Sequence, residues 1–277
     1  MRRTCVTGSP YAYCVTPYYA DASVTLYRGE ALAVLRELPD ASVDAVITDP
    51  PYSSGGQFRG DRAKRTGEKY VNENMATLRS LNDFTGDNRD QRGFEYWCAL
   101  WLGECLRVTR PGGLLMLFTD WRQLPALTDS VQAGGWVWRG IIPWNKPNAR
   151  VFAGRITNAC EYVVWGSHGQ LPNPLDGGAG FPGFYVVSSP REREHQAQKP
   201  LDVMRGLMAP VPTDGLVLDP FAGSGTTGVA AVIEGRRFVG VELTEHYAQV
   251  AVDRLRTAAM QPGTGEQADI FAELARG

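Results

Sequence analysis

Residues 215–243, GLVLDPFAGSGTTGVAAVIEGRRFVGVEL, decide the fold class of this 277-residue chain. The apolar run GLVLD (215–219) predicts a buried strand, TTGVAAVIEG (226–235) a helix, and RFVGVEL (237–243) a second strand. A glycine turn joins the first strand to the helix. A strand, a crossover helix and a second strand form a β-α-β unit, which predicts an α/β fold with parallel strands.

The same alternation of strands and helices continues towards the N-terminus. Strands are predicted at 24–28, 43–48, 114–120, 136–144 and 160–166, and helices at 29–38, 94–113, 121–135 and 244–259. The helix at 94–113 is expected to close at Pro111 and the two glycines after it. These elements predict a mainly parallel sheet with helices on both faces. No repeat or linker divides the chain, so we expect a single domain over 1–277.

Two stretches lack an apolar period. Residues 53–93 are polar, glycine-rich and charged, so a mobile insertion is expected there. Residues 167–190 are rich in glycine and proline, so a short irregular loop is expected. Trp136, Trp138 and Trp144 are expected in the core, and of these only Trp144, within PWNKPN, could also face a site.

The composition is that of a globular protein from a reducing compartment. Hydrophobic residues form 43% of the chain and charged residues 21%, and the net charge of −2 gives no general support for a nucleic-acid partner. The five cysteines include no CxxC pair, which argues against disulfides and a metal site and favours the cytoplasm. We find no apolar leader and no run of about 18 apolar residues, so neither secretion nor membrane insertion is expected.

The stretch LDPFAGSGTTG (218–228) has the features of a nucleotide-type cradle. Gly223 and Gly225 would let the backbone approach a ligand at the N-terminus of a helix, although such a turn can also be purely structural. Phe221 could cover a ligand face, and Glu242 ends the next strand about 20 residues on, where an acid can bind ribose hydroxyls. The loop lacks the lysine of a phosphate-binding loop, so ATP is not expected.

The stretch ITDPPYSSGG (47–56) places an acid, two prolines and an aromatic ring at the end of another strand. Proline cannot donate to a sheet ladder and fixes its own φ, so Pro50 and Pro51 stop the strand and stiffen the turn. The residue before a proline is driven towards extended backbone, which keeps Asp49 open. A rigid carboxylate beside Tyr52 suits a site for a flat ligand better than it suits a simple turn.

With these motifs together, the chain resembles the amino-directed DNA methyltransferases, which use S-adenosylmethionine. DPPY (49–52) matches the catalytic tetrapeptide, DPFAGSGTT (219–227) the cofactor loop, GVELTEHY (240–247) the ribose-binding acid, and HQAQKP (195–200) resembles the HPTQKP element. IIPWNKPN and NACEYVVWG are similar to the central strand pair. The resemblance implies a Rossmann-like methyltransferase fold with the permuted motif order of the β group. Asp at the first position of DPPY is more typical of adenine-N6 than of cytosine-N4 enzymes.

The resemblance also implies roles for single residues. Asp49 and the Pro50 carbonyl would accept the two N–H groups of the target amine, Pro51 would stiffen them, and Tyr52 would stack on a flipped base. Glu30 stands where the family usually has Asp, and it could instead be a surface residue; Lys199 could likewise be a solvated charge. The expected cofactor-binding residues are Glu30, Lys199, Asp219, Phe221, Gly223, Ser224, Gly225, Thr226 and Glu242.

Double-stranded DNA is the expected partner, and residues 53–93 and 167–190 are the candidate recognition segments. The basic residues closest after Tyr52 are Arg59, Arg62, Lys64, Arg65 and Lys69, which could grip phosphates or form a solvated loop. A homodimer and a cognate restriction endonuclease are further partners that the resemblance suggests. Two alternatives remain open: a protein amide methyltransferase, although those enzymes carry NPPY after the cofactor motif, and a non-catalytic cofactor- or DNA-binding module.

Overall fold

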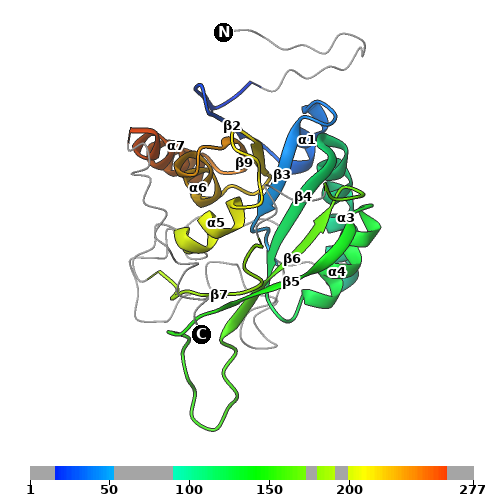
Figure 1. Ribbon diagram of the computed structural model, residues 1–277, viewed down its shortest axis with the longest axis vertical. Coiled ribbons are helices and arrows are strands. Elements are labelled where there is room, and N and C mark those ends of the chain that lie inside the picture. Colours follow the sequence, from blue (N-terminus) through cyan, green and yellow to red (C-terminus); the bar gives the residue numbers. More distant parts are fainter. Residues whose placement is uncertain (1–15, 53–89, 173–179, 191–198, 261–277) are drawn as a thin grey trace.

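The computed structural model describes residues 16–52, 90–172, 180–190 and 199–260 (Figure 1). Its strands are β1 (Tyr19–Ala20), β2 (Val24–Arg28), β3 (Val43–Thr48), β4 (Thr109–Thr119), β5 (Val137–Asn145), β6 (Cys160–Ser167), β7 (Tyr185–Val186), β8 (Leu216–Asp219) and β9 (Arg237–Glu242). Its helices are α1 (Ala31–Glu37), α3 (Gln91–Val108), α4 (Leu124–Ala133), α5 (Leu201–Met208), α6 (Thr226–Ile233) and α7 (Glu245–Met260).

The described strands form one sheet in the order β1-β2-β9-β8-β3-β4-β6-β5-β7. The run β2-β9-β8-β3-β4 is parallel throughout, and β7 is parallel to β5. The pairings of β1 with β2, of β4 with β6 and of β5 with β6 are antiparallel. The predicted mainly parallel α/β sheet is therefore confirmed.

Helices cover both faces of the sheet, with α1, α3 and α4 on one side and α5, α6 and α7 on the other (Figure 1). Successive residues of a strand point to opposite faces. In β4, Leu114, Met116 and Phe118 therefore pack under α5–α7, whereas Leu115 and Leu117 pack under α1, α3 and α4. Helix α3 contributes Cys98 and Cys105 to this second core, so both thiols serve packing. None of the helices in the described ranges is both long and apolar enough to cross a membrane.

The boundary between α3 and β4 differs from the prediction. The helix ends at Val108, and β4 already begins at Thr109, so the segment Pro111–Gly113 belongs to the strand. Val43 pairs with Thr109 but Ala45 pairs with Leu114, so the four residues 110–113 bulge out of the ladder. A bulge tolerates the missing N–H of proline. A Cβ at Gly113 would lie 2.8 Å from the Asp44 carbonyl oxygen, which explains a glycine there.

Three further expectations need correction. Residues 90–93 cap and begin α3 instead of belonging to an insertion, while residues 53–89 lie outside the described ranges. The stretch 167–190 contains β7, whose Tyr185 is buried, and residues 173–179 are not described. Trp136 and Trp144 are buried as expected, but Trp138 is 41% exposed. The short β7 pairs only with Trp144 and Asn145, so the beginning of β5 is left at the sheet edge.

Candidate active site

The sheet brings the two chemical motifs together at the C-terminal ends of neighbouring strands. Strand β3 pairs with β8, so Asp49, which follows β3, and Asp219, which ends β8, lie at the same edge. The Thr48 hydroxyl donates a hydrogen bond of 2.6 Å to Asp219 Oδ1 and joins the ends of the two strands directly. This edge of a doubly wound sheet is where α/β proteins bind ligands.

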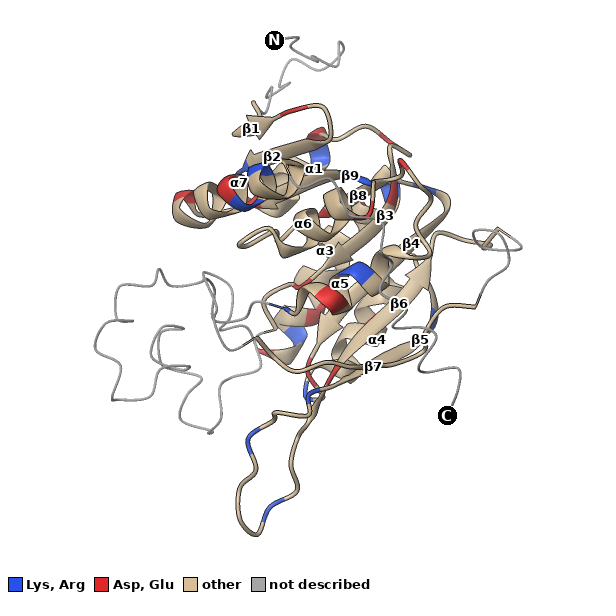
Figure 2. Cartoon of the chain, turned by 60° about the vertical axis from the view of Figure 1, so that its left-hand side comes forward, with Lys and Arg blue, Asp and Glu red and all other residues tan. Residues whose placement is uncertain are grey.

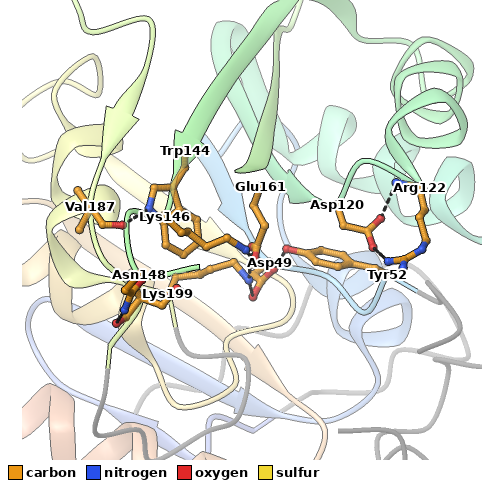
Figure 3. A network of polar contacts seen from close by, with 11 residues as sticks. Asp49, Tyr52, Asp120, Arg122, Trp144, Lys146, Asn148, Glu161, Val187 and Lys199 are labelled. Atoms are coloured by element: carbon orange, nitrogen blue, oxygen red, sulfur yellow. Dashed lines mark hydrogen bonds and ion pairs between the residues drawn. The ribbon is translucent and has the colours of Figure 1, made fainter. Parts of the chain in front are cut away.

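Four ionisable side chains form an ion network at this edge, in which Lys199 is buried and the others are half-buried: Asp49, Lys199, Glu161 and Lys146 (Figure 3). Lys199 Nζ lies 2.6 Å from Asp49 Oδ2 and 3.3 Å from Glu161 Oε2. Lys146 Nζ lies 3.0 Å from Glu161 Oε1. The Lys199 side chain is only 6% exposed, so the prediction that it lies at the site is favoured over a solvated charge. Two carboxylates and two ammonium groups make the network neutral overall.

The network sets the charge of each member. Burial raises the pKa of Asp49, and the Lys199 ammonium and the Tyr52 hydroxyl oppose that rise. Burial alone would also raise the pKa of Glu161, but Lys199 and Lys146 outweigh it and lower that pKa. Burial would lower the pKa of Lys199, but Asp49 and Glu161 outweigh it and raise that pKa. Glu161 and Lys199 are therefore held as an ion pair beside Asp49.

Tyr52 is held against the carboxylate of its own motif. Its hydroxyl donates a hydrogen bond to Asp49 Oδ1, and the Lys199 ammonium lies 5.3 Å from the centre of its ring. Burial raises the pKa of Tyr52 well above its usual value, so the hydroxyl stays a donor. One oxygen of Asp49 thus faces Tyr52 and the other faces Lys199, and each retains capacity to accept a further hydrogen bond.

The predicted cofactor loop follows β8 and leads into α6. Gly223 and Gly225 have φ values of +52° and +80°, which side chains rarely adopt, so both positions require glycine. A Cβ at Gly225 would lie 3.0 Å from Ala251 Cβ, which shows that this glycine lets α6 approach α7. At Gly223 the nearest atom to such a Cβ is 4.0 Å away, so this side of the loop is open to a ligand.

The two acids of the cofactor motifs are buried and bonded to the loop. Asp219 Oδ1 also accepts from the Phe221 backbone N–H at 3.0 Å, and burial raises the pKa of Asp219 to about 6. Glu242 is 7% exposed, and it accepts from Gly223 N at 3.1 Å and from the N–H and hydroxyl of Thr244, both at 2.7 Å. Burial raises the pKa of Glu242 as well. These acids fix the loop and leave its open side at Gly223.

Sequence reasoning missed Arg254, which holds the cofactor loop from α7. Arg254 Nη1 donates to the Ser224 carbonyl at 2.7 Å, to the Ser224 hydroxyl at 2.9 Å and to the Thr226 hydroxyl at 3.1 Å. Ser224 and Thr226 were predicted to contact the cofactor, and their hydroxyls here face Arg254. No sequence motif includes this arginine, and the structure places it on α7 beside the buried Ala251 and Leu255.

Glu161, Lys146 and Trp97 were also missed. Glu161 lies within the motif-like stretch NACEYVVWG and Lys146 within IIPWNKPN, but pattern alone did not separate them from their neighbours. Trp97 of α3 lies 5.4 Å from the ring of Phe221, and Trp101 lies 5.1 Å from it. Phe221 is therefore fixed against α3 at the mouth of the cofactor loop.

The remaining predicted residues divide into two groups. Glu30 is exposed and caps α1, accepting from the Ala33 N–H at 2.8 Å. It follows β2 closely, and Arg28 of β2 pairs with Glu242, so Glu30 lies at the same sheet edge as the cofactor acids. The basic residues Arg59, Arg62, Lys64, Arg65 and Lys69 lie outside the described residues.

Comparisons with known proteins identify the family of the chain. M.Cfr9I of Citrobacter freundii, named a type II methyltransferase, is 30% identical over 271 residues, which cover 84% of this chain and 87% of that protein. The structure named PvuII DNA methyltransferase (cytosine-N4-specific) matches with a TM-score of 0.65 at 17% identity and covers 90% of this chain and 96% of its own. The M1.HpyAVI–SAM complex matches with a TM-score of 0.59 at 23% identity, covering 84% of this chain and 98% of that one.

The fold is thus that of known DNA methyltransferases. The family model described as DNA methylase (N6/N4) matches residues 43–253, from the first residue of β3 into α7. That range contains Asp49, Lys199, Asp219 and Glu242. The chain therefore belongs to the N6/N4 family of DNA methylases.

Proposed function

We propose that this protein transfers a methyl group from S-adenosylmethionine to the N6 amine of adenine in double-stranded DNA. The observation that carries the proposal is the junction of β3 and β8. There the Asp49 carboxylate, held by Tyr52 and Lys199, lies at the same sheet edge as the glycine loop. An amine acceptor and a cofactor loop at one edge are what a direct transfer to an exocyclic amine requires.

The chemistry depends on positioning. When bound, S-adenosylmethionine supplies a methyl group that is already activated. The adenine amine is a poor nucleophile because its lone pair is delocalised into the ring. Asp49 and the Pro50 carbonyl each accept one N–H of the amine, which favours a pyramidal nitrogen and directs its lone pair. Lys199 and Tyr52 hold the Asp49 carboxylate in place, so little reorganisation is needed during the reaction.

The cofactor binds at the open side of the glycine loop. The Glu242 carboxylate exchanges its contacts within the loop for ribose hydroxyls, and Phe221, fixed by Trp97 and Trp101, covers one face of the ligand. Asp219, Gly223, Ser224, Gly225 and Thr226 form the floor of this site, with Glu30 and Lys199 at its edge. Titration calorimetry tests the ribose role, because Glu242→Ala must weaken cofactor binding if it is correct.

The target base is extruded from the duplex, since the amine cannot be reached inside it, and Tyr52 stacks on it. The order of motifs, with DPPY before the cofactor loop, supports a place in the β group. Two further segments contribute to DNA recognition, 53–89 with its basic residues 59–69 and the loop around 167–190. The similarity to a protein named a type II methyltransferase supports a modification enzyme. A cytoplasmic location, a cognate restriction endonuclease and a homodimer belong to the proposal as expectations.

The alternative function is methylation of cytosine N4. The same two acceptors would serve a cytosine amine, and the fold matches a protein named as cytosine-N4-specific. Mass spectrometry of nucleosides from DNA treated with enzyme and cofactor decides between them. N6-methyladenine supports the proposal, and N4-methylcytosine alone replaces it with the alternative. Cofactor binding without methylation of any DNA would select a non-catalytic module.

A first prediction concerns Asp49→Ala. Removing a positioned acceptor should lower the rate of methyl transfer on the order of a hundredfold or more. Cofactor affinity should stay within about threefold, because Asp49 does not belong to the glycine loop. The measurements are methyl incorporation into DNA and calorimetric titration of the cofactor. Asp129→Ala on the exposed face of α4 is the control. A loss of tenfold or less in Asp49→Ala would mean that Asp49 is not the acceptor of the amine.

A further inference from the structure

Residues 146–159 connect β5 to β6 and form the β5–β6 loop. Thr119 of β4 and Pro143 of β5 both pair with Tyr162 of β6, so β4 and β5 end at the same edge of the sheet. That edge also carries Asp49. The β5–β6 loop therefore leaves the sheet beside the ion network, and both views show it reaching far out from the body of the molecule (Figures 1 and 2).

The root of the β5–β6 loop is fixed to the active site. Lys146, its first residue, binds Glu161 through its ammonium group at 3.0 Å, and its N–H donates to the Ala159 carbonyl at 2.8 Å. Asn148 exchanges two hydrogen bonds of 2.9 Å with the backbone of Ser189. A ligand that binds this loop and shifts its first residue, Lys146, would therefore also shift the ion network.

The tip of the β5–β6 loop is a defined turn. The Arg155 N–H donates to the Phe152 carbonyl at 3.2 Å, and Gly154 has a φ of +70°. A positive φ at the third of four residues, with a hydrogen bond from the fourth to the first, is typical of a type II β-turn. No atom lies within 4 Å of a Cβ placed on Gly154, so the tip stands free of the rest of the described chain.

The chemistry of the β5–β6 loop is one-sided. It carries Lys146, Arg150 and Arg155 and no acidic residue, as the basic segments along the loop in Figure 2 show. Near the tip, Val151 is 75% exposed and Ile156 is 96% exposed. Phe152 is 37% exposed, and the Arg150 guanidinium lies 4.8 Å from its ring. Clustered apolar side chains that are exposed on a protein surface indicate a binding site for another molecule.

We propose that the β5–β6 loop is a DNA-contacting element of this enzyme. Arg150 and Arg155 bind backbone phosphates, while Val151, Phe152 and Ile156 pack against sugars and bases beside the extruded nucleotide. This inference rests on the proposed function. Nucleic acid fits the loop better than a second copy of the chain does, because two such loops in contact would bring only positive charges together. DNA offers the negative charge that complements the two arginines and the apolar base surface against which Val151, Phe152 and Ile156 can pack.

The test uses the full-length protein and a short DNA duplex of mixed sequence, with affinity measured by fluorescence anisotropy over a series of salt concentrations. Arg150→Ala/Arg155→Ala should weaken binding and reduce the slope of log affinity against log salt by about two, one for each lost phosphate contact. Val151→Ser/Ile156→Ser should weaken binding by about tenfold at every salt concentration, with the slope unchanged.

Arg36→Ala/Arg237→Ala is the matched control. It removes the same charge, but Arg36 lies in the last turn of α1 and Arg237 begins β9, so both are at the opposite edge of the sheet. This variant should keep the wild-type affinity and slope. If the Arg150/Arg155 variant and the control behave alike, the loop does not bind phosphates and the inference is overturned.

Two other outcomes separate this inference from the proposed function. If the wild type methylates DNA but the two loop variants bind DNA as it does, the function stands and the loop has no part in it. If the loop variants change the sedimentation of the protein without changing its DNA affinity, the loop is a protein contact and the inference is overturned. Failure of the wild type to methylate any DNA would instead reject the proposed function.

Discussion

At the scale of single residues, Asp49 has to remain ionised although burial raises its pKa. Lys199 opposes that rise, and the charge of Glu161 adds to it. A protonated Asp49 is a much weaker acceptor for the amine N–H than the charged carboxylate is. Methyl transfer should therefore fall as the pH drops through the pKa of Asp49, and the two neighbours should move this acidic limb in opposite directions.

Lys199→Met and Glu161→Gln form a matched pair for this prediction. Lys199→Met removes a positive charge 2.6 Å from Asp49, so the pKa of Asp49 should rise and the acidic limb should move to higher pH. Glu161→Gln removes a nearby negative charge, so the limb should move to lower pH. The measurement is the pH profile of the rate constant for methyl transfer in single-turnover experiments. Limbs that move in the same direction, or not at all, would show that Asp49 does not control the profile.

Asp219 gives a second prediction, in which stability and function oppose each other. Burial raises its pKa from 3.8 to about 6, so between these pH values the folded protein binds more protons than the unfolded chain. The free energy of unfolding therefore falls as pH rises through this interval. At 1.36 kcal/mol for each pH unit, the charged carboxylate costs about 3 kcal/mol at most above pH 6.

Asp219→Asn should remove this cost. The expected result is a higher free energy of unfolding at pH 8 and little difference from wild type at pH 4, where Asp219 is largely protonated in the folded protein. Urea unfolding at both pH values measures it, and the wild type at pH 4 serves as the internal control. Cofactor affinity should fall in the same variant, because the carboxylate faces the loop. If Asp219→Asn and the wild type have the same free energy of unfolding at pH 8, the charge of Asp219 does not destabilise the folded protein.

Residue identity predicted part of this site and not the rest. Asp49, Tyr52, Asp219 and Glu242 stand in short motifs that are local in sequence, so they could be found without a structure. Glu161 could not, because its role comes from ion pairs with Lys146 and Lys199, which are distant in sequence or on another segment. The ribose, base and phosphate contacts inferred from the motifs remain predictions.

At the scale of elements, the periodic patterns placed most strands and helices correctly. The errors came where tertiary pairing overrides a local signal. Pro111 and its glycines are a strong helix stop, yet Val108 already ends α3 because Thr109 pairs with Val43 in the sheet. Trp138 is 41% exposed at the beginning of β5, where β7, which pairs with Trp144 and Asn145, does not extend. Neither the end of α3 nor the exposure of Trp138 could be predicted without knowing the order of the strands in the sheet.

Helix α7 supports a prediction at this scale, because Arg254 joins it to the cofactor loop across 28–30 residues of sequence. Arg254→Met should weaken cofactor binding by about tenfold, since a charged donor to the Ser224 carbonyl and hydroxyl is lost. Arg256→Met on the same helix is the control, because Arg256 contacts the ring of Tyr19 instead. Calorimetric titration measures both variants. Equal affinities in the two would show that the loop holds its shape without α7.

At the scale of the whole molecule, the sheet interleaves the two halves of the chain. Strand β3, which leads into the predicted catalytic motif, lies between β8 of the half with the predicted cofactor loop and β4 of its own half. The motif order along the chain can therefore be permuted without moving the site, since only the adjacency of β3 and β8 matters. This adjacency also means that neither half has a complete sheet alone.

A last prediction follows from this interleaving, namely that the chain unfolds as a single domain. Trp101 packs in the core under α1, α3 and α4, and Trp144 packs in the core on the other face. Two variants that each keep one of the seven tryptophans, either Trp101 or Trp144, therefore report on opposite sides of the sheet. Urea unfolding followed by either tryptophan and by far-ultraviolet circular dichroism should give one coincident transition. Saturating cofactor at about a hundred times its Kd should shift all three curves together by about 2.7 kcal/mol. Two separated transitions, of which the cofactor moves only one, would instead divide the chain into a catalytic unit and a cofactor unit.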